Sequence, residues 1–127
     1  MILDELAQVI AAHGLGTLGT SLFLGRLPPT PDSVIALRES GGPPPINTFD
    51  ASYERPTLQV LVRGSVYPTA RLHAERLYQA LMTVANTSIN GVWYIHATPD
   101  GPPTLLEHDE TGRPILVFNL EVEKEFE

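Results

Sequence analysis

The sequence predicts an α+β domain in which two helices pack on a mostly antiparallel sheet. Two segments, 2–13 and 68–86, place apolar residues three and four positions apart, as the buried face of a helix requires. Several shorter runs alternate apolar with polar residues, and clusters of proline and glycine separate them. The predicted order of elements is α-β-β-β-α-β-β-β. At 127 residues the chain has room for one domain, which we expect to span residues 1–127.

The first helix is expected over residues 2–13. Asp4 and Glu5 lie in its first turn, where carboxylates interact favourably with the helix dipole, and Gly14 is suited to end it. The residues that share one face are Ile2, Leu6, Val9, Ile10 and His13. We therefore expect this helix to bury that side against the sheet.

Three strands are expected between the two helices, over residues 21–25, 33–38 and 58–62. The third is the best defined, because its apolar residues occupy every second position. Residues 40–54 are rich in proline and glycine, and we expect them to form a long loop. A loop of this length in a small domain usually has a function.

The second helix is expected over residues 68–86, with Pro68 in the first position, where its missing N–H is no loss. Its predicted buried stripe consists of Ala70, Ala74, Leu77, Tyr78, Leu81, Val84 and Ala85. Three further strands follow, over residues 92–98 and 104–107 and from about residue 113 to the C-terminus.

Composition excludes several classes of protein. Cysteine is absent, which excludes disulfide bonds, thiolate nucleophiles and metal sites built on cysteine. The net charge is −7, with 8 Lys and Arg residues against 15 Asp and Glu residues, so tight binding to nucleic acid is not expected. No apolar run reaches the roughly 18 residues that span a bilayer, and the first residues are acidic where a signal peptide is basic. We therefore expect a soluble protein that is made in a cytoplasm and has no membrane partner.

Residues 14–19 read Gly-Leu-Gly-Thr-Leu-Gly, which is the glycine spacing of a dinucleotide-binding loop. Such a loop follows a strand and opens a helix, so that the pyrophosphate meets the helix N-terminus. Here a helix is expected before the glycines and a strand after them. Glu39 has the spacing of a ribose-binding acid, but the reversed order of elements contradicts that role. We interpret the motif as a connector and expect no cofactor.

Histidine and carboxylate residues gather at residues 107–110, with His96 on a neighbouring predicted strand. Such groups bind zinc or carry out acid–base chemistry. However, no second histidine stands at metal-ligand spacing on the same element. A solvated loop is the preferred interpretation, with no catalytic and no metal-binding residue. A small metal-dependent hydrolase using His96, His108 and Asp109 stays as the enzymatic alternative.

The last predicted strand separates its side chains into an apolar row and an acidic row. Alternate residues of a strand face opposite ways, and members of one row lie roughly 7 Å apart. The acidic row consists of Glu121, Glu123, Glu125 and Glu127. Two interpretations stay open: a solvated outer face, or a face lining a channel through which DNA passes without sticking. Lys124 interrupts the apolar row, which predicts that the strand leaves the core there.

The order of these segments resembles the tail-terminator, or minor capsid, proteins of long-tailed phages and gene transfer agents. No single segment is specific, and the resemblance rests on their order and spacing over nearly the whole chain. The segments that carry it are the N-terminal helix, Leu22–Pro28, Pro31–Leu37, the glycine–proline loop, Glu54–Gly64, Tyr67 and the helix after it, Asp109–Arg113 and Asn119.

The resemblance implies a structural virion protein without catalysis or cofactor. In that family several copies, as a homohexamer, form a ring on the last layer of the tail tube. The ring stops tube polymerisation and offers a joining surface to a head-completion or stopper protein, while DNA passes through its centre without specific binding. The implied location is the head–tail junction of a virion assembled in the host cytoplasm.

Four residues are candidates for contacts between subunits or with the tube. Phe49 and Tyr53 are aromatic residues on the otherwise polar 40–54 loop, and such residues often anchor interfaces. Arg63 and Arg71 are candidates to pair with the acidic strand of an adjacent subunit, although exposed ion pairs are individually weak.

Two further alternatives stay open at this point. One is another head–tail connector component, such as an adaptor, stopper or tail-completion protein, which binds on the portal side. The other is a ligand-binding domain with a pocket between helix and sheet.

Overall fold

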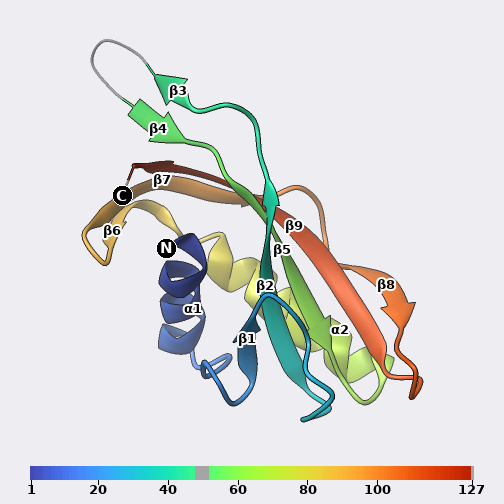
Figure 1. Cartoon of the computed structure of the whole chain (residues 1–127). Coiled ribbons are helices and arrows are strands. Elements are labelled where there is room, and N and C mark those ends of the chain that lie inside the picture. The colour runs from blue at the N-terminus through green and yellow to red at the C-terminus, as the bar shows by residue number, and fades with distance from the viewer. Residues whose placement is uncertain (48–51, 127) are drawn as a thin grey trace.

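The computed structural model describes residues 1–47 and 52–126 (Figure 1). The two helices are α1 (Ile2–Ala12) and α2 (Tyr67–Leu81). Within the described residues one sheet contains nine strands, which confirms the predicted α+β class. The strands are β1 (Leu22–Leu24), β2 (Val34–Gly41), β3 (Ile46–Asn47), β4 (Ser52–Glu54), β5 (Thr57–Arg63), β6 (Ala85–Ile89), β7 (Val92–Pro99), β8 (Thr104–His108) and β9 (Pro114–Glu125). None of the described helices is long and apolar enough to span a membrane.

The long strand β9 is the centre of the sheet. On one side it pairs with β5 and, near its end, with β4, and on the other side with β7 and β8. All these pairings are antiparallel, and β1 with β2 is the parallel pair. The register places Val60 of β5 opposite Phe118 of β9, so the apolar rows of both strands face the same way.

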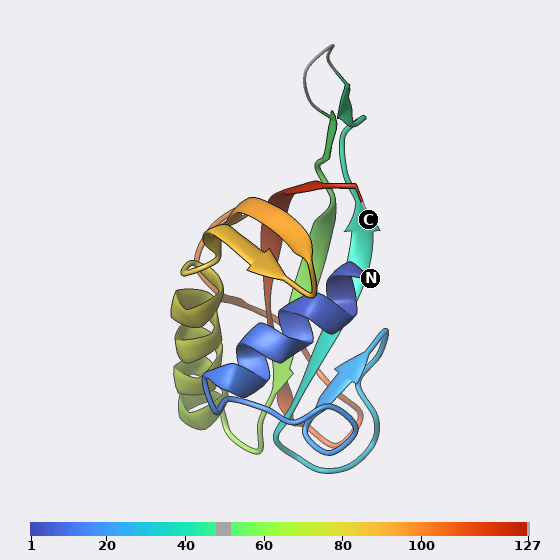
Figure 2. The same cartoon turned by 90° about the vertical axis from the view of Figure 1, so that its left-hand side faces the viewer.

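Both helices cover one face of the sheet, here called the inner face (Figures 1 and 2). The main core lies between them and the apolar rows of β2, β5, β7 and β9. Tyr78 of α2 meets Phe118 of β9 edge to face, with 5.7 Å between ring centres. Each buried leucine in this layer contributes about 2 kcal/mol of hydrophobic stabilisation, and Leu6, Leu77 and Leu116 are fully buried.

The opposite face, here called the outer face, carries no helix (Figure 2). Near the start of β9 it holds a small apolar cluster of Ala36, Leu61 and Ile115, and Leu27 from the loop between β1 and β2 packs against this cluster. No helix covers the rest of the outer face, which is open to contacts with other molecules.

The segment 40–54 contains strands where the sequence predicted only a loop. β2 continues to Gly41, and β3 pairs with β4 to form a hairpin that projects from the body (Figure 1). We call β3 and β4 together the arm. A glycine is required at its base, because a Cβ at Gly42 (φ +130°) would lie 2.3 Å from the carbonyl oxygen of Arg55.

The second helix is shorter than predicted, and β6 was missed. α2 ends at Leu81, and the Thr83 hydroxyl donates to the carbonyl oxygen of Ala80 at 2.6 Å. Ala85 then pairs with His96 of β7. The prediction of helix to residue 86 was wrong because pairing with β7 stabilises these residues as a strand.

Lys124 does not leave the core, contrary to the prediction. Its side chain is 2% exposed and lies on the inner face, where Nζ is 3.3 Å from the Glu54 carboxylate. Nζ also lies 5.9 Å from the centre of the Tyr94 ring. The ion pair and the aromatic face together accommodate the charge inside the fold.

Candidate functional site

The acidic row of β9 lies on the outer face of the sheet. Its described members are Glu121, Glu123 and Glu125, while Glu127 lies outside the described residues. The side chains between them in sequence, Val122 and Lys124, are buried on the inner face. Strand alternation therefore directs the glutamates away from the helices.

Two of these glutamates are held by β7. The Oε2 atom of Glu123 lies 3.1 Å from Nε2 of His96. Glu125 accepts a hydrogen bond of 2.8 Å from the backbone N–H of Trp93. Glu121 is exposed. Glu123 and Glu125 are therefore held in place by β7, and Glu121 continues the acidic strip as an exposed residue.

A surface depression adjoins this strip. Pro43, Arg55 and Thr57 line it on one side, and His96, Glu121 and Glu123 on the other. It lies on the outer face, away from the helices, and does not correspond to the pocket between helix and sheet that a ligand-binding domain would need.

The arm presents Tyr53, which the sequence singled out as an interface candidate. Tyr53 is half-buried and stands opposite Ile46 within the hairpin and opposite Glu125 of β9. Ser52 donates a 2.7 Å hydrogen bond to Asn47 across the hairpin. Phe49, the second aromatic candidate, lies outside the described residues.

The base of the arm is held on both faces of the sheet. Nε of Arg55 donates to the carbonyl oxygen of Pro44 at 3.0 Å. On the inner face, Glu54 pairs with Lys124, as described above. Beyond it, the Tyr94 hydroxyl donates to the buried carboxylate of Glu5 in α1. Through Tyr94 and Lys124, the first helix is therefore connected to β4 of the arm.

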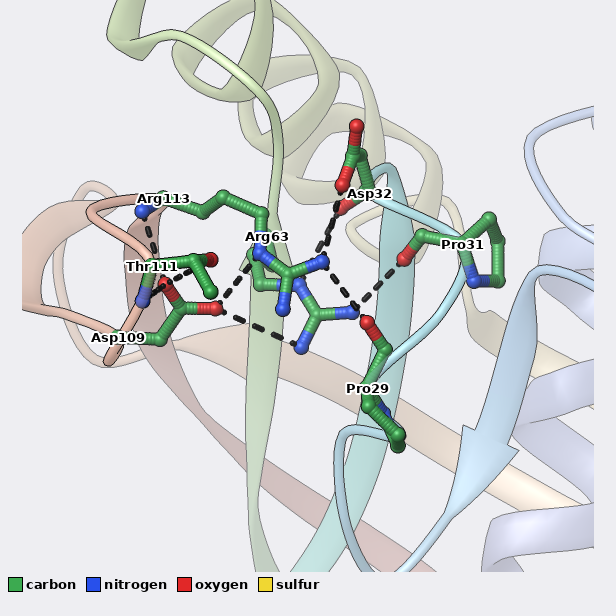
Figure 3. A network of polar contacts seen from close by, with 7 residues as sticks. All are labelled: Pro29, Pro31, Asp32, Arg63, Asp109, Thr111 and Arg113. Atoms are coloured by element: carbon green, nitrogen blue, oxygen red, sulfur yellow. Dashed lines mark hydrogen bonds and ion pairs between the residues drawn. The ribbon is translucent and has the colours of Figure 1, made fainter.

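Arg63 lies in a polar network at the other end of the sheet (Figure 3). Its side chain is 4% exposed, and Nη1 is 3.9 Å from the Asp109 carboxylate. Its guanidinium donates to the carbonyl oxygens of Pro31 at 2.7 Å and Asp32 at 3.3 Å. Burial lowers the pKa of Arg63, although an arginine stays protonated in proteins. The guanidinium contacts Pro31, Asp32 and Asp109 of the same subunit. This position does not favour the predicted pairing of Arg63 with a neighbouring subunit.

Asp109 is the central acceptor of the same network. It accepts from the Arg113 backbone N–H at 2.8 Å, from Nε of Arg113 at 2.7 Å and from the Thr111 hydroxyl at 3.0 Å. Desolvation acts to raise the pKa of Asp109, but these hydrogen bonds outweigh it and lower the pKa to about 2. Arg113 also pairs with Asp32 at 2.9 Å. The network joins the β1–β2 loop, the end of β5 and the β8–β9 turn.

The structure separates the residues of the enzymatic alternative. His96 contacts Glu123, whereas His108 stands opposite Pro114. These two partners are nine positions apart along β9, which corresponds to roughly 30 Å. Within residues 1–47 and 52–126, no three His, Cys, Asp or Glu side chains lie close enough together to hold a metal ion. The three candidate residues therefore do not form one site.

The glycine motif has a structural role. Residues 14–19 connect the end of α1 to β1, in the order helix then strand. Gly14 has φ +70° just after the helix, a conformation that favours glycine. A Cβ at Gly16 would lie 3.1 Å from the Ile35 side chain, so the connector packs closely on the sheet.

α2 presents an apolar and basic surface that the sequence identified only in part. Arg71, a predicted interface residue, forms an i,i+4 ion pair of 2.7 Å with Glu75. A shallow depression is lined by Tyr67, Pro68, Arg71, Leu72 and Glu75. Tyr67 and Leu72 are 45% and 53% exposed, which is high for large apolar side chains. The exposure of Leu72 was predictable from the sequence, because Leu72 lies on the side of the helix opposite the buried stripe.

Trp93 was also missed. It is the single tryptophan of the chain and is 42% exposed on the outer face, between the buried residues Val92 and Tyr94. The alternation of β7 was a signal for its outward position.

The fold and sequence agree with one known family. The model of the bacteriophage tail terminator protein matches residues 9–126. Among solved structures, the chain is similar to a chain in the virion of a native gene transfer agent particle, with a TM-score of 0.72 and 13% sequence identity. That alignment covers 98% of this chain and 95% of the other, and at this identity it shows the fold alone. Among curated proteins, no sequence matches this chain. The family model spans all but the first eight residues and the last one, so the resemblance is confirmed and this chain belongs to the bacteriophage tail terminator family.

Proposed function

We propose that this protein forms a ring that caps the tail tube, stops its polymerisation and provides the surface to which the head is joined. Membership of the tail terminator family and the likeness of the fold to a gene transfer agent virion chain support a structural role in a virion. The observation that carries the proposal is the outer face, a helix-free sheet surface with an acidic strip along its central strand.

The acidic strip is suited to line the channel of such a ring. DNA is a polyanion, and a wall of the same charge lacks the Lys and Arg contacts through which proteins retain phosphates. Glu121, Glu123 and Glu125 would face the passing DNA, with Glu127 extending the row in sequence. The ring, proposed as a homohexamer, therefore lets DNA pass without specific binding.

The remaining surfaces are proposed to contact proteins. The arm, which carries Tyr53, is suited to reach an adjacent subunit or the tail tube protein, because it projects from the body (Figure 1). Phe49, four positions before Tyr53 in the sequence, is proposed to take part in the same contact. Arg71 on α2 is proposed to face a neighbouring subunit. The other partner is a head-completion or stopper protein, and the place of action is the head–tail junction of the virion, assembled in the host cytoplasm. No catalytic step is part of this role.

Deletion of the gene in its particle-producing system, followed by electron microscopy, tests the proposal. Tails of uncontrolled length that are detached from filled heads are the expected result. Tails of normal length beside unattached heads would instead assign a joining role, such as that of an adaptor, stopper or tail-completion protein. Intact and infectious particles would exclude both structural roles.

A further inference from the structure

We infer that neighbouring copies meet head to tail, with Trp93 and Glu125 of one copy docking on the α2 depression of the next. This inference rests on the proposed ring and names the surfaces by which it is built. The occupant of the α2 depression is a second copy of this chain, and its anchor is the single tryptophan.

The α2 surface has the properties of a receiving site. Tyr67 and Leu72 expose about half of their side chains around a shallow depression, and Arg71 and Glu75, paired at 2.7 Å, also line it. Arg76 is exposed on the same helix. With two arginines against one glutamate, α2 has a small net positive charge in a chain whose net charge is −7. A partner surface that is apolar and acidic therefore fits it best.

The Trp93 surface is complementary in both respects. The indole is 42% exposed on the outer face, and its own backbone N–H binds the Glu125 carboxylate at 2.8 Å. The indole of Trp93 is suited to the apolar depression at Tyr67 and Leu72. The carboxylate of Glu125 is suited to pair with Arg71. Tryptophan, tyrosine and arginine are also the residues that most often dominate interface energy.

The two surfaces lie where a ring requires them. Trp93 faces outward near the β6–β7 hairpin, whereas α2 covers the inner face and begins at the opposite end of the molecule (Figure 1). Contact between two different surfaces is heterologous, and it closes into a ring or continues as a filament rather than stopping at a dimer. In this arrangement Glu125, which the proposed function places along the channel, lies at the contact with the neighbouring copy instead. Glu121 and Glu123 then form the part of the row that faces the channel.

Cysteine cross-linking in assembled particles tests the inference, because the native chain contains no cysteine. Ser88 of β6 is exposed and stands opposite Trp93, so Ser88→Cys labels one surface without removing the anchor. Leu72→Cys labels the other. With a short bis-maleimide reagent, we expect covalent dimers when the two single variants are co-expressed, none from either variant alone, and a ladder of multimers from the double variant.

Two results would overturn the inference. Dimers from one single variant alone would show that identical surfaces meet. Complete particles of the double variant that yield no cross-link would show that copies meet through other faces. In both cases particles still assemble, so the terminator role stands. Failure of that role is seen separately, as intact particles after gene deletion.

Substitutions test the energetic claim. Trp93→Ala should weaken association between copies about tenfold or more, seen as a lower cross-link yield between Ser88→Cys and Leu72→Cys. Leu106→Ala is the matched control, since Leu106 is 50% exposed on β8 and outside both surfaces. Arg71→Glu should reduce the yield, and the added change Glu125→Arg should restore it, whereas Arg26→Glu should have no effect. An unchanged yield with Trp93→Ala would contradict the inference.

Discussion

The Nζ atom of Lys124 lies 3.3 Å from Oε2 of Glu54, and this ion pair joins the central strand of the sheet to the base of the arm. Lys124 is almost fully buried, whereas Glu54 is 37% exposed. Solvent therefore stabilises the carboxylate, while the ammonium depends on its contacts within the protein. The buried ammonium of Lys124 therefore links the arm to the core of the protein.

Glu54→Gln should destabilise the protein by about 1–2 kcal/mol, because buried Lys124 loses its ion pair with Glu54. The value lies below that for a fully buried pair, since Glu54 is partly solvated. Lys124→Met should be close to neutral, because it removes the charge and keeps most of the volume. Urea unfolding measures both, with Glu107→Gln on the exposed strand β8 as control. If Glu54→Gln and Lys124→Met lowered the free energy of unfolding equally, the unpaired ammonium would not be the cause of the loss.

Asp109→Asn should reduce the dependence of stability on acid pH. The pKa of Asp109 is lowered to about 2 in the folded protein, against about 3.9 in an unfolded chain. A lowered folded pKa means that its contribution is fully present above the unfolded pKa and is lost as pH falls through the folded value. The free energy of unfolding should therefore fall less steeply between about pH 4 and pH 2 in the variant than in the parent.

Thermal or urea unfolding at several pH values measures this slope. Asp100→Asn is the matched control, because Asp100 is exposed and takes no part in the network of Figure 3. A slope that is the same in parent and Asp109→Asn would contradict the assignment.

Arg63→Ala should cost about 2–4 kcal/mol of folding free energy, because it leaves the carbonyl oxygens of Pro31 and Asp32 without their buried donor. Arg71→Ala should cost no more than about 0.5 kcal/mol, since its ion pair with Glu75 lies on the surface. Chemical denaturation of the two variants checks the contrast. Similar losses would mean that one of the two arginines has been assigned the wrong role.

Replacement of the acidic strip should affect DNA transfer rather than folding. In particles that carry Glu121→Gln together with Glu123→Gln, we expect normal tails and attached heads but DNA ejection slowed several-fold, because the channel wall repels DNA less. The slowing should diminish at high salt, where charge interactions are screened. Glu107→Gln with Glu110→Gln, on the exposed β8–β9 segment, serves as control. Ejection at the parental rate at all salt concentrations would exclude the channel role.

Much of the fold was predictable because local pattern and final environment agree. α1, β5, β7 and β9 have apolar residues at the period of their own element, and the structure buries those residues on the inner face. β6 has the polar sequence Ala-Asn-Thr-Ser-Ile, without a period, and it is a strand because β7 pairs with it. The arm was missed for the same reason, since β3 and β4 are short and are defined by their partners.

The sequence by itself determined the fold class, the acidic row and the family, since each depends on the order and spacing of residues along the chain. Only the tertiary structure decided which charged side chains are buried within the fold and which lie on the surface. Arg63 and Arg71 look alike in sequence, but only Arg63 meets the β1–β2 loop and the β8–β9 turn. In the sequence Lys124 interrupts the apolar row of β9, which suggests that the strand leaves the core there. In the structure its contacts with Glu54 and Tyr94 stabilise its buried position. The reason is physical: the cost of burying a charge depends on the partners that distant segments bring to it, and spacing along the chain does not record them.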